Sequence, residues 1–299
     1  MLYPNFSELI KLQAASTGNI LKNKYNQNSL TAGDYNSLFR GQGMEFDSVR
    51  PYIVGDDIRY IDWRVTARTH KPHIKTFQAE CDRKIMLIVD SNSYMRFGTR
   101  GTFKSIQAAR AVALLAGMGF KNRDRVGGLV FGDIAEGVKF FPPTRQRAAA
   151  WSLFKLLCEP NVISKQLITL EFALRQLKHI SPGTLIFLIT DLEAIIATNV
   201  QLFAEIKAKG DLILLPIVDP IDSNFPELSN VVCTNNAGLE VNINAVSAAT
   251  RKKYAELWHA EQNQLKNILK KYKLKLITLK TNQAVHRDLN YGLQQLRNY

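Results

Sequence analysis

The sequence predicts an α/β fold, with a doubly wound, mostly parallel β-sheet between two layers of helices. Short β-branched runs typical of buried strands recur at residues 85–89, 185–190 and 212–218. Segments with helical spacing of apolar residues separate these runs, and this alternation is typical of parallel sheets. Residues 1–83 lack the alternation. We therefore expect them to form an irregular or β-rich N-terminal extension, followed by an α/β domain of residues 84–299.

The elements can be assigned in order along the chain. In the extension, only residues 7–15 have helical spacing. In the α/β domain, strands are expected at residues 85–89, 126–131, 138–141, 185–190, 212–218 and 274–279. Helices are expected at residues 103–120, 148–157, 170–179, 199–209, 247–272 and 285–296. Pro142-Pro143 is expected to end a strand, because proline cannot donate to the ladder. Residues 219–244 are predicted to be loops with a short edge strand.

The chain is strongly basic. Its 299 residues carry a formal net charge of +13, and basic residues are dense between Arg251 and Lys280. A charge of this size favours acidic partners. We expect most of the excess on the solvated face of the helix at residues 247–272, and a nucleic-acid footprint is the alternative.

Cysteine usage and apolar stretches indicate the compartment. Cys81, Cys158 and Cys233 are odd in number and far apart, which argues against a disulfide framework and for a reducing compartment. The first residues lack the basic and apolar regions of a signal peptide. The longest apolar stretches are shorter than the roughly 18 residues that a spanning helix needs. We therefore expect a cytoplasmic protein with no transmembrane segment.

Residues 50–68 interleave acids and arginines with aromatic and β-branched residues. Guanidinium groups pair with carboxylates in a bidentate fork, so we predict a half-buried ion-pair network; scattered salt bridges at a domain edge are the alternative. The carboxylates could also serve acid–base chemistry, but arginines at this density lower their pKa values and favour structural pairing. The residues assigned to this block are Glu45, Arg50, Asp56, Asp57, Arg59, Asp62, Trp63 and Arg68.

The same block resembles the signature of the bacterial family called domain of unknown function 58, GxEFxxVRxYxxGDDxRxIDWxxxAR. The matching residues are Gly43, Glu45, Phe46, Val49, Arg50, Tyr52, Gly55, Asp56, Asp57, Arg59, Ile61, Asp62, Trp63, Ala67 and Arg68. The resemblance extends to the strand ending at Asp90, and more weakly to the C-terminus. It implies a von Willebrand factor A-like, Rossmann-type second part and frequent association with MoxR-type AAA+ ATPases. It implies no established enzymatic activity.

Asp90 and Asp191 each end a predicted buried strand. In an open parallel sheet, ligands bind beyond the carboxyl ends of the strands where the connection order reverses. If the sheet has the common doubly wound order, both carboxylates face one crevice, and oxygen ligands of this kind suit Mg²⁺ or Ca²⁺. The resemblance to von Willebrand A domains implies a metal-ion-dependent adhesion site. Its tentative ligands here are Asp90, Asn92, Asp191 and Thr169.

The sequence departs from the adhesion-site pattern of Asp-x-Ser-x-Ser with a distant Thr and Asp. Asn92 and Tyr94 replace the two serines, and Thr169 lies one place late, behind Ile168. We therefore expect a degenerate site. Asp90 and Asp191 either bind Mg²⁺ or another divalent cation, or serve as caps and hydrogen-bond anchors.

Residues 98–105 imitate a phosphate-binding loop. They follow a strand, open a helix and end in Lys104-Ser105. The motif needs a glycine immediately before the lysine, where this chain has Phe103. Capping of the helix by Thr102 is therefore the expected role of this segment.

These observations favour a non-enzymatic protein-interaction module that works as an adaptor with a MoxR-type AAA+ ATPase. We assign no catalytic residue and no cofactor-binding residue beyond the tentative metal ligands. The alternatives are a nucleic-acid-binding protein that uses its basic surface, and a metal-dependent hydrolase at the edge that carries Asp90 and Asp191.

Overall fold

The computed structural model describes residues 3–16, 44–79, 83–160, 167–177, 180–227, 229, 231–234, 240–243 and 246–297. The chain forms two compact units: one contains Met1–Leu21 and Arg83–Tyr299, and the other contains Lys22–Asp82. The larger unit therefore begins close to the boundary predicted at residue 84. It also takes in the N-terminal helix α1 (Phe6–Ala15), which we had assigned to the extension.

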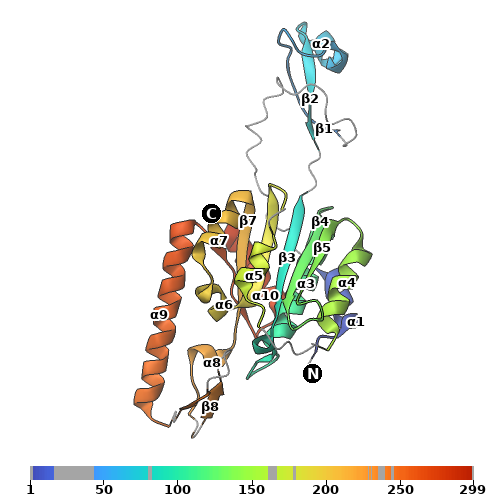
Figure 1. Cartoon of the computed structure of the whole chain (residues 1–299). Helices are drawn as coiled ribbons and strands as arrows, with labels where there is room; N and C mark the ends of the chain where they lie inside the picture. The colour runs from blue at the N-terminus through green and yellow to red at the C-terminus, as the bar shows by residue number, and fades with distance from the viewer. Residues whose placement is uncertain are drawn as a thin grey trace. The chain divides into compact units, whose positions relative to one another are not determined.

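The larger unit is built on a seven-stranded sheet with the order β10-β7-β6-β3-β4-β5, to which β11 adds beside β7. The strands pair in parallel except for β5, which is antiparallel to β4. The predicted doubly wound, mostly parallel α/β fold is thus confirmed (Figure 1). The strands are β3 (Lys84–Ser91), β4 (Arg125–Gly132), β5 (Val138–Thr144), β6 (Thr184–Asp191), β7 (Gly210–Val218), β10 (Lys275–Leu276) and β11 (Leu279–Lys280).

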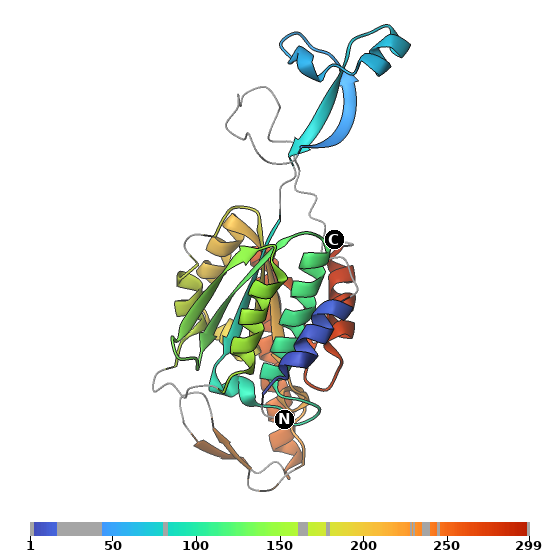
Figure 2. The ribbon, with the colours of Figure 1, turned by 90° about the vertical axis from the view of Figure 1, so that its right-hand side faces the viewer.

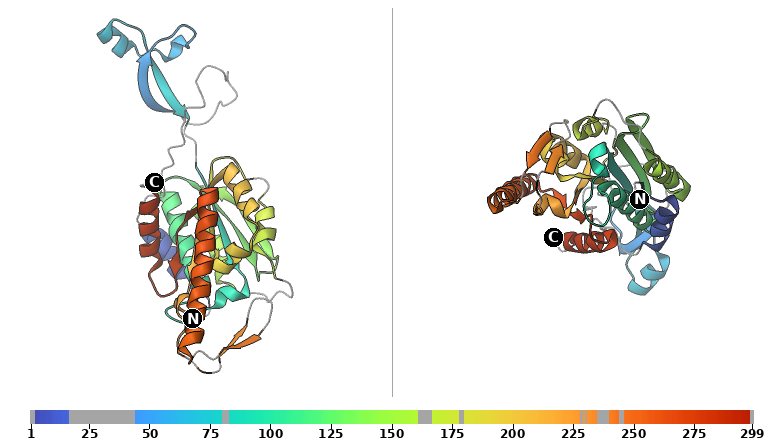
Figure 3. Two further views of the ribbon diagram at one scale, coloured as in Figure 1. Left: turned by 90° about the vertical axis from the view of Figure 1, so that its left-hand side faces the viewer. Right: turned by 90° about the horizontal axis from the view of Figure 1, so that it is seen from below.

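Helices cover both faces of this sheet because its central strands are apolar on both sides. In β3, Leu87 packs into the core with α1, α3, α4 and α10, whereas Ile88 packs into the core with α5, α6, α7 and α9. Figure 3 shows α9 running alongside the unit. The helices are α3 (Lys104–Lys121), α4 (Arg147–Cys158), α5 (Leu170–Arg175), α6 (Leu192–Ala197), α7 (Val200–Lys209), α9 (Ala248–Tyr272) and α10 (Val285–Arg297).

Helix α1 belongs to the larger unit because it packs on α3 (Figure 2). Its Leu9 is fully buried in the core. Glu8 forms an ion pair of 2.7 Å with Arg110 of α3. Gly117 of α3 permits this close approach, because a Cβ there would lie 2.2 Å from the carbonyl oxygen of Gln13.

Several predicted elements differ in the structure. Strand β5 continues through Pro142-Pro143 to Thr144, because β5 ends the sheet order and the missing N–H groups interrupt no second ladder. The strand predicted at residues 274–279 is two short strands, β10 and β11. The helix predicted at residues 170–179 ends at Arg175, and residues 178–179 lie outside the described residues. Where we predicted loops with a short edge strand, two strands, β8 (Val231–Thr234) and β9 (Glu240–Ile243), form a hairpin, preceded by α8 (Pro220–Ser223).

The described part of the smaller unit is a β-hairpin with a long connection. Strands β1 (Met44–Pro51) and β2 (His73–Ala79) pair antiparallel, and η1 (Ile58–Tyr60) and α2 (Trp63–Thr69) lie between them. The connection begins with a tight turn, in which the Asp56 N–H donates to the Ile53 carbonyl at 3.0 Å. Gly55 has a φ of 110°, so the turn needs a residue without a Cβ there.

Among the described helices of both units, none is long and apolar enough to cross a membrane.

Candidate functional site at the carboxyl edge of the sheet

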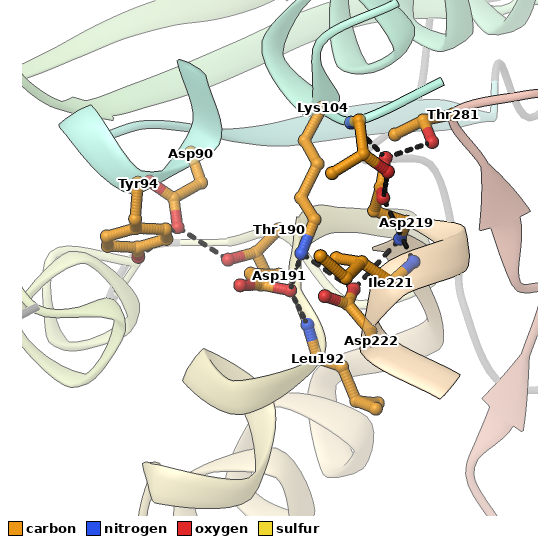
Figure 4. A network of polar contacts seen from close by, with 11 residues as sticks. Asp90, Tyr94, Lys104, Thr190, Asp191, Leu192, Asp219, Ile221, Asp222 and Thr281 are labelled. Atoms are coloured by element: carbon orange, nitrogen blue, oxygen red, sulfur yellow. Dashed lines mark hydrogen bonds and ion pairs between the residues drawn. The ribbon is translucent and has the colours of Figure 1, made fainter. Parts of the chain in front are cut away.

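Three neighbouring parallel strands carry an aspartate at or just after their carboxyl ends. Strand β6 lies between β3 and β7. The aspartates are Asp90 in β3, Asp191 at the end of β6 and Asp219 just after β7. Asp90 and Thr190 follow the paired residues Val89 and Ile189, so Asp90 and Asp191 lie at the same edge of the sheet, as predicted. We call this edge, with the side chains that contact the three aspartates, the rim (Figure 4).

Asp90 is almost fully buried, at 1% exposed, and its two oxygens accept bonds from four donors. Oδ1 accepts from the backbone N–H of Asn92 at 3.0 Å and from its side-chain amide at 2.8 Å. Oδ2 accepts from the hydroxyls of Tyr94 and Thr190, both at 2.5 Å. Burial raises the pKa of Asp90 to about 6, although the four donors act in the opposite direction.

Asn92 and Tyr94, which replace the expected serines, both donate hydrogen bonds to Asp90. The Asn92 amide nitrogen also donates to the Ile168 carbonyl at 3.0 Å, which fixes the loop after β3 to the segment before α5. The Asn92 Oδ1 atom is buried and accepts no hydrogen bond from the described residues. Burial and the nearby Asp90 charge raise the pKa of Tyr94, so its phenol stays a neutral donor.

Lys104, the first residue of α3, places a buried ammonium group in the rim. Its Nζ lies 3.0 Å from Asp191 Oδ1 and 2.9 Å from Asp222 Oδ2, although the residue is only 3% exposed. Burial lowers the pKa of Lys104, but the charges of Asp191 and Asp222 outweigh this effect and raise it above the ordinary value. Lys104 is therefore a permanent cation held between two carboxylates.

Asp219 ties three segments together at the end of β7. It accepts hydrogen bonds from the backbone N–H and the hydroxyl of Thr99 and from the hydroxyl of Thr281, the last at 2.6 Å. It also caps α8, where the Asp222 side chain accepts in return from the Asp219 N–H at 2.8 Å. Burial alone would raise the pKa of Asp219, but the hydrogen bonds from Thr281 and Thr99 outweigh burial, so the pKa is lower than usual.

Two exposed acidic residues lie near the rim. Glu193 is exposed at the start of α6, and Glu261 is exposed on α9. Burial raises the pKa of both groups, and Asp191 adds to the increase in each case. Glu193 also raises the pKa of Glu261, so the two carboxylates lie within electrostatic reach of each other.

Arg96 supplies a second cation from the connection between β3 and α3. Its guanidinium group lies 3.2 Å from Asp133, a buried residue just after β4. Arg96 in the connection and Lys104 at the start of α3 thus pair with acids at the ends of β4 and β6.

The four tentative metal ligands do not converge on one point. Asp90 is saturated by hydroxyl and amide donors, and Asp191 accepts from Lys104 and from the Leu192 N–H. Thr169 caps α5, where its hydroxyl accepts from the Phe172 N–H at 3.2 Å. Asn92 Oδ1 is buried and accepts no hydrogen bond from the described residues. The described residues contain no cluster of three or more His, Cys, Asp or Glu side chains suited to a metal ion. This donor set does not fit a divalent cation.

Sequence reasoning missed Lys104, Asp219 and Asp222. Asp219 follows a predicted strand just as Asp90 and Asp191 do, so the same argument could have found it. We noted Lys104 only in the imitation phosphate loop, and its partners lie 87 and 118 residues away in the sequence. The predicted capping by Thr102 is wrong, because Phe103 occupies the N-cap of α3 without a side-chain hydrogen bond.

The charged block of the smaller unit forms separate ion pairs, which corrects the predicted half-buried network. Arg50 binds Asp56 in a bidentate fork at 2.6 and 2.7 Å. Arg59 binds Asp57 at 2.7 Å, although its side chain is 84% exposed. The pairings occur between close neighbours in the chain, so the alternative of local salt bridges fits better. They lower the pKa values of Asp56 and Asp57, as expected for structural carboxylates.

The remaining residues of the charged block lie in β1 and at α2. Asp62 caps α2 through the backbone N–H groups of Arg64 and Val65. Trp63 and Arg68 lie exposed on α2. Glu45 lies in β1 opposite Gln78.

The chain belongs to the family described as "Protein of unknown function DUF58", whose sequence pattern matches residues 48–264. It is 26% identical over 277 residues to uncharacterized protein Rv1480 of Mycobacterium tuberculosis and to uncharacterized protein Mb1516 of Mycobacterium bovis. These alignments cover 91% of this chain and 86% of each relative. The family resemblance drawn from the signature block is thereby confirmed.

Among solved structures, the chain is similar to the conserved hypothetical protein BatB from Bacteroides thetaiotaomicron, with a TM-score of 0.44 and 15% identity. That match covers 73% of this chain and 100% of the BatB chain. The VWA domain of SpRpn10 matches with a TM-score of 0.38 and 11% identity, over 70% of this chain and 94% of the domain.

Proposed function

We propose that this protein is a non-enzymatic protein-interaction module, which works in the cytoplasm as an adaptor beside a MoxR-type AAA+ ATPase. The choice of ATPase comes from the family resemblance. The docking role is supported by the rim, whose inner groups bind one another while Glu193 and Glu261 remain exposed beside them.

The observation that carries the proposal is that hydroxyls of the rim are occupied by hydrogen bonds within the chain. The hydroxyls that could act as nucleophiles, those of Thr190, Tyr94 and Thr281, donate to aspartates of the same chain. Thr190 is fully buried, so a substrate would not reach it. A catalytic site needs a nucleophile, a base and a charge-stabilising group converging on a reachable point. The rim is therefore better suited to hold loops in position than to perform hydrolysis.

The exposed acids beside the rim provide the docking surface in this proposal. The exposed acids are Glu193 and Glu261, and both lie within electrostatic reach of Asp191 and Asp222, which hold Lys104 between them. In a chain with a formal charge of +13, this local excess of negative charge is distinctive. Complementary charge guides association and selects partners, so we propose that a basic surface of the ATPase docks here.

We further propose that the rim works without a divalent cation, as a degenerate adhesion site. A metal ion would have to displace the Lys104 ammonium from Asp191, or the hydroxyls from Asp90. Lys104 already supplies the positive charge that the strand-end carboxylate requires, with no dependence on metal concentration.

The test is binding between the full-length protein and the MoxR-type ATPase of the same cell, measured by biolayer interferometry. We expect saturable binding that falls by about tenfold or more in Glu193→Lys/Glu261→Lys. The matched control is Glu136→Lys, an exposed acid in the connection between β4 and β5. The proposal fails if the wild-type proteins do not bind, or if both variants bind equally well.

Nucleic-acid binding remains the second candidate, because α9 exposes a row of lysines: Lys252, Lys253, Lys266 and Lys270. Binding of this kind depends steeply on salt, because the protein releases counterions from the phosphates. Retention on heparin that disappears between about 50 and 200 mM salt would favour it. The preferred account predicts that Lys252→Glu/Lys253→Glu leaves ATPase binding unchanged.

A further inference from the structure

We propose that the exposed end of the smaller unit is a second docking surface, which takes an acidic protein surface with protruding apolar side chains. We call it the tip, and it comprises Ile53, Val54, Ile58, Tyr60, Trp63, Arg64, Arg68 and Lys71. The inference rests on the proposed function, because an adaptor needs a separate surface for each of the two proteins that it joins.

The tip exposes several large apolar side chains close together in the sequence. Val54 is 94% exposed, Trp63 70% and Ile58 66%, and Ile53 and Tyr60 are exposed as well. All five lie within residues 53–63, between the two strands of one hairpin. Single apolar residues are common on surfaces, but gathered ones mark interaction sites. Tryptophan and tyrosine in particular dominate the binding energy of protein interfaces.

The charges at the tip indicate the chemistry of the partner. The acids of this segment are occupied: Asp56 pairs with Arg50, Asp57 with Arg59, and Asp62 caps α2. In contrast, Arg64, Arg68 and Lys71 are exposed and make no ion pair with the described residues. Arg64 and Arg68 are four residues apart on α2 and therefore lie on one side of it. The tip thus presents free positive charge beside apolar side chains, which complements an acidic and apolar surface.

The backbone of the tip is held firmly, so docking would cost little conformational entropy. The bidentate Arg50–Asp56 pair closes the first turn, because Asp56 also accepts from the Ile53 N–H. The Asp62 N–H donates to the His73 carbonyl at 2.8 Å, which fixes the start of α2 to β2. A preorganised surface binds more tightly because fewer groups need to be ordered on binding. The ion pairs of the signature block therefore have a role: they hold the apolar side chains outward.

A protein partner suits the tip better than a nucleic acid or a lipid surface. Single-stranded nucleic acids bind through rows of aromatic side chains on which bases stack. Here three of the five exposed apolar residues are the aliphatic Ile53, Val54 and Ile58. Helices that lie on membranes are long and amphipathic, whereas α2 has 7 residues.

The test begins with a photo-reactive p-benzoylphenylalanine at position 54 of the full-length protein, illuminated in the source cell. Val54 is the most exposed of these residues, so its replacement should leave the fold intact. The same residue at position 257, an exposed leucine on α9, is the matched control. We expect a cross-link from position 54, but not from position 257, to an acid-rich apolar segment of one other protein. Cross-links only within the chain, only to lipid or nucleic acid, or to nothing would overturn the inference.

The second step measures binding of the purified full-length protein to the protein identified by the cross-link. We expect Arg64→Glu/Arg68→Glu and Trp63→Ser each to weaken binding by tenfold or more. Changing the cross-linked acids of the partner to lysine should restore binding to Arg64→Glu/Arg68→Glu. Lys252→Glu/Lys253→Glu and Leu257→Ser should have no effect. Equal binding by wild type and the tip variants would overturn the inference. If ATPase binding still depends on Glu193 and Glu261 in that case, the proposed function survives without a second surface at the tip.

Discussion

The ammonium group of Lys104 lies 3.0 Å from the carboxylate of Asp191, at the end of the strand next to β3. The same ammonium reaches Asp222 at 2.9 Å, so one side chain joins the first turn of α3 to the ends of β6 and α8. Because all three groups are largely buried, the arrangement fixes both the charge and the shape of the rim. The following predictions depend on this relationship and on the hydrogen bonds around it.

Lys104→Met should destabilise the protein by about 3–5 kcal/mol, because it leaves two largely buried carboxylates without their cation. Chemical denaturation at pH 7 measures this change. Lys139→Met is the control, since its ion pair with Glu136 is exposed and should contribute less than about 1 kcal/mol. In the double variant Lys104→Met/Asp222→Asn, part of the loss should be recovered. A cost for Lys104→Met similar to that of Lys139→Met would contradict the account.

The stability of the protein should depend on the ionisation of Asp90. Its folded-state pKa of about 6 lies above the ordinary 3.8, so its contribution is fully present below pH 3.8 and is lost as the pH rises through 6. Between pH 4 and pH 7, wild type should therefore lose about 2 kcal/mol of unfolding free energy relative to Asp90→Asn. Urea denaturation of both proteins across this range measures the difference.

The pH dependence of stability should have the opposite sign for Asp219→Asn in the same experiment. The pKa of Asp219 is lowered, so its contribution is present above the ordinary pKa of an aspartate and disappears as the pH falls through the folded-state value. The cost of Asp219→Asn should thus be larger at pH 7 than at pH 3. A pH-independent cost for both variants would show that neither carboxylate is perturbed as described.

Gly101→Ala should disturb the loop that precedes Lys104. Gly101 has a φ of 87°, and a Cβ there would lie 2.6 Å from the Thr281 carbonyl oxygen. Strain in the left-handed region costs about 1–2 kcal/mol, and forced overpacking adds about 1–3 kcal/mol. Gly137→Ala is the control, because Gly137 also has a positive φ, but a Cβ there would lie 3.5 Å from its nearest neighbour, without a clash. Gly101→Ala should therefore lower the unfolding free energy by clearly more than Gly137→Ala, and equal losses would contradict the described contact.

Thr281→Val should cost about 2 kcal/mol, because the lost hydrogen bond has a buried carboxylate as its acceptor. Thr198→Val removes a hydrogen bond of similar length to a neutral carbonyl, that of Ala194, and should cost about 1 kcal/mol. Thermal unfolding of the two variants compares them directly. The order of the two costs is the result that matters.

The sequence was sufficient for the fold and for part of the rim. Buried strands are short apolar runs, and each run that ends in Asp90 or Asp191 marks its own carboxyl end, so the shared edge followed from the doubly wound order. Local signals also predicted that Asp56 pairs with an arginine.

The missing part of the rim depends on contacts between distant segments. From the sequence alone, Lys104 is expected to be an exposed residue at the start of a helix. Its partners lie in β6 and α8, and only folding brings them close to it. The sequence assigns helix α1 to the extension for the same reason, since its close contact with Gly117 forms only when α3 has folded. In the smaller unit, the interleaved charges predicted burial, whereas the structure uses them as local pairs that leave Trp63 exposed.

Titration calorimetry with Mg²⁺ tests the central claim most directly, with wild type, Asp90→Ala and Asp191→Asn compared under identical buffer conditions. With Lys104 as the cation of the rim, we predict no saturable heat for any of the three proteins at millimolar Mg²⁺. Saturable binding by wild type that disappears in Asp90→Ala and Asp191→Asn would show a functioning metal site and contradict the role assigned to Lys104.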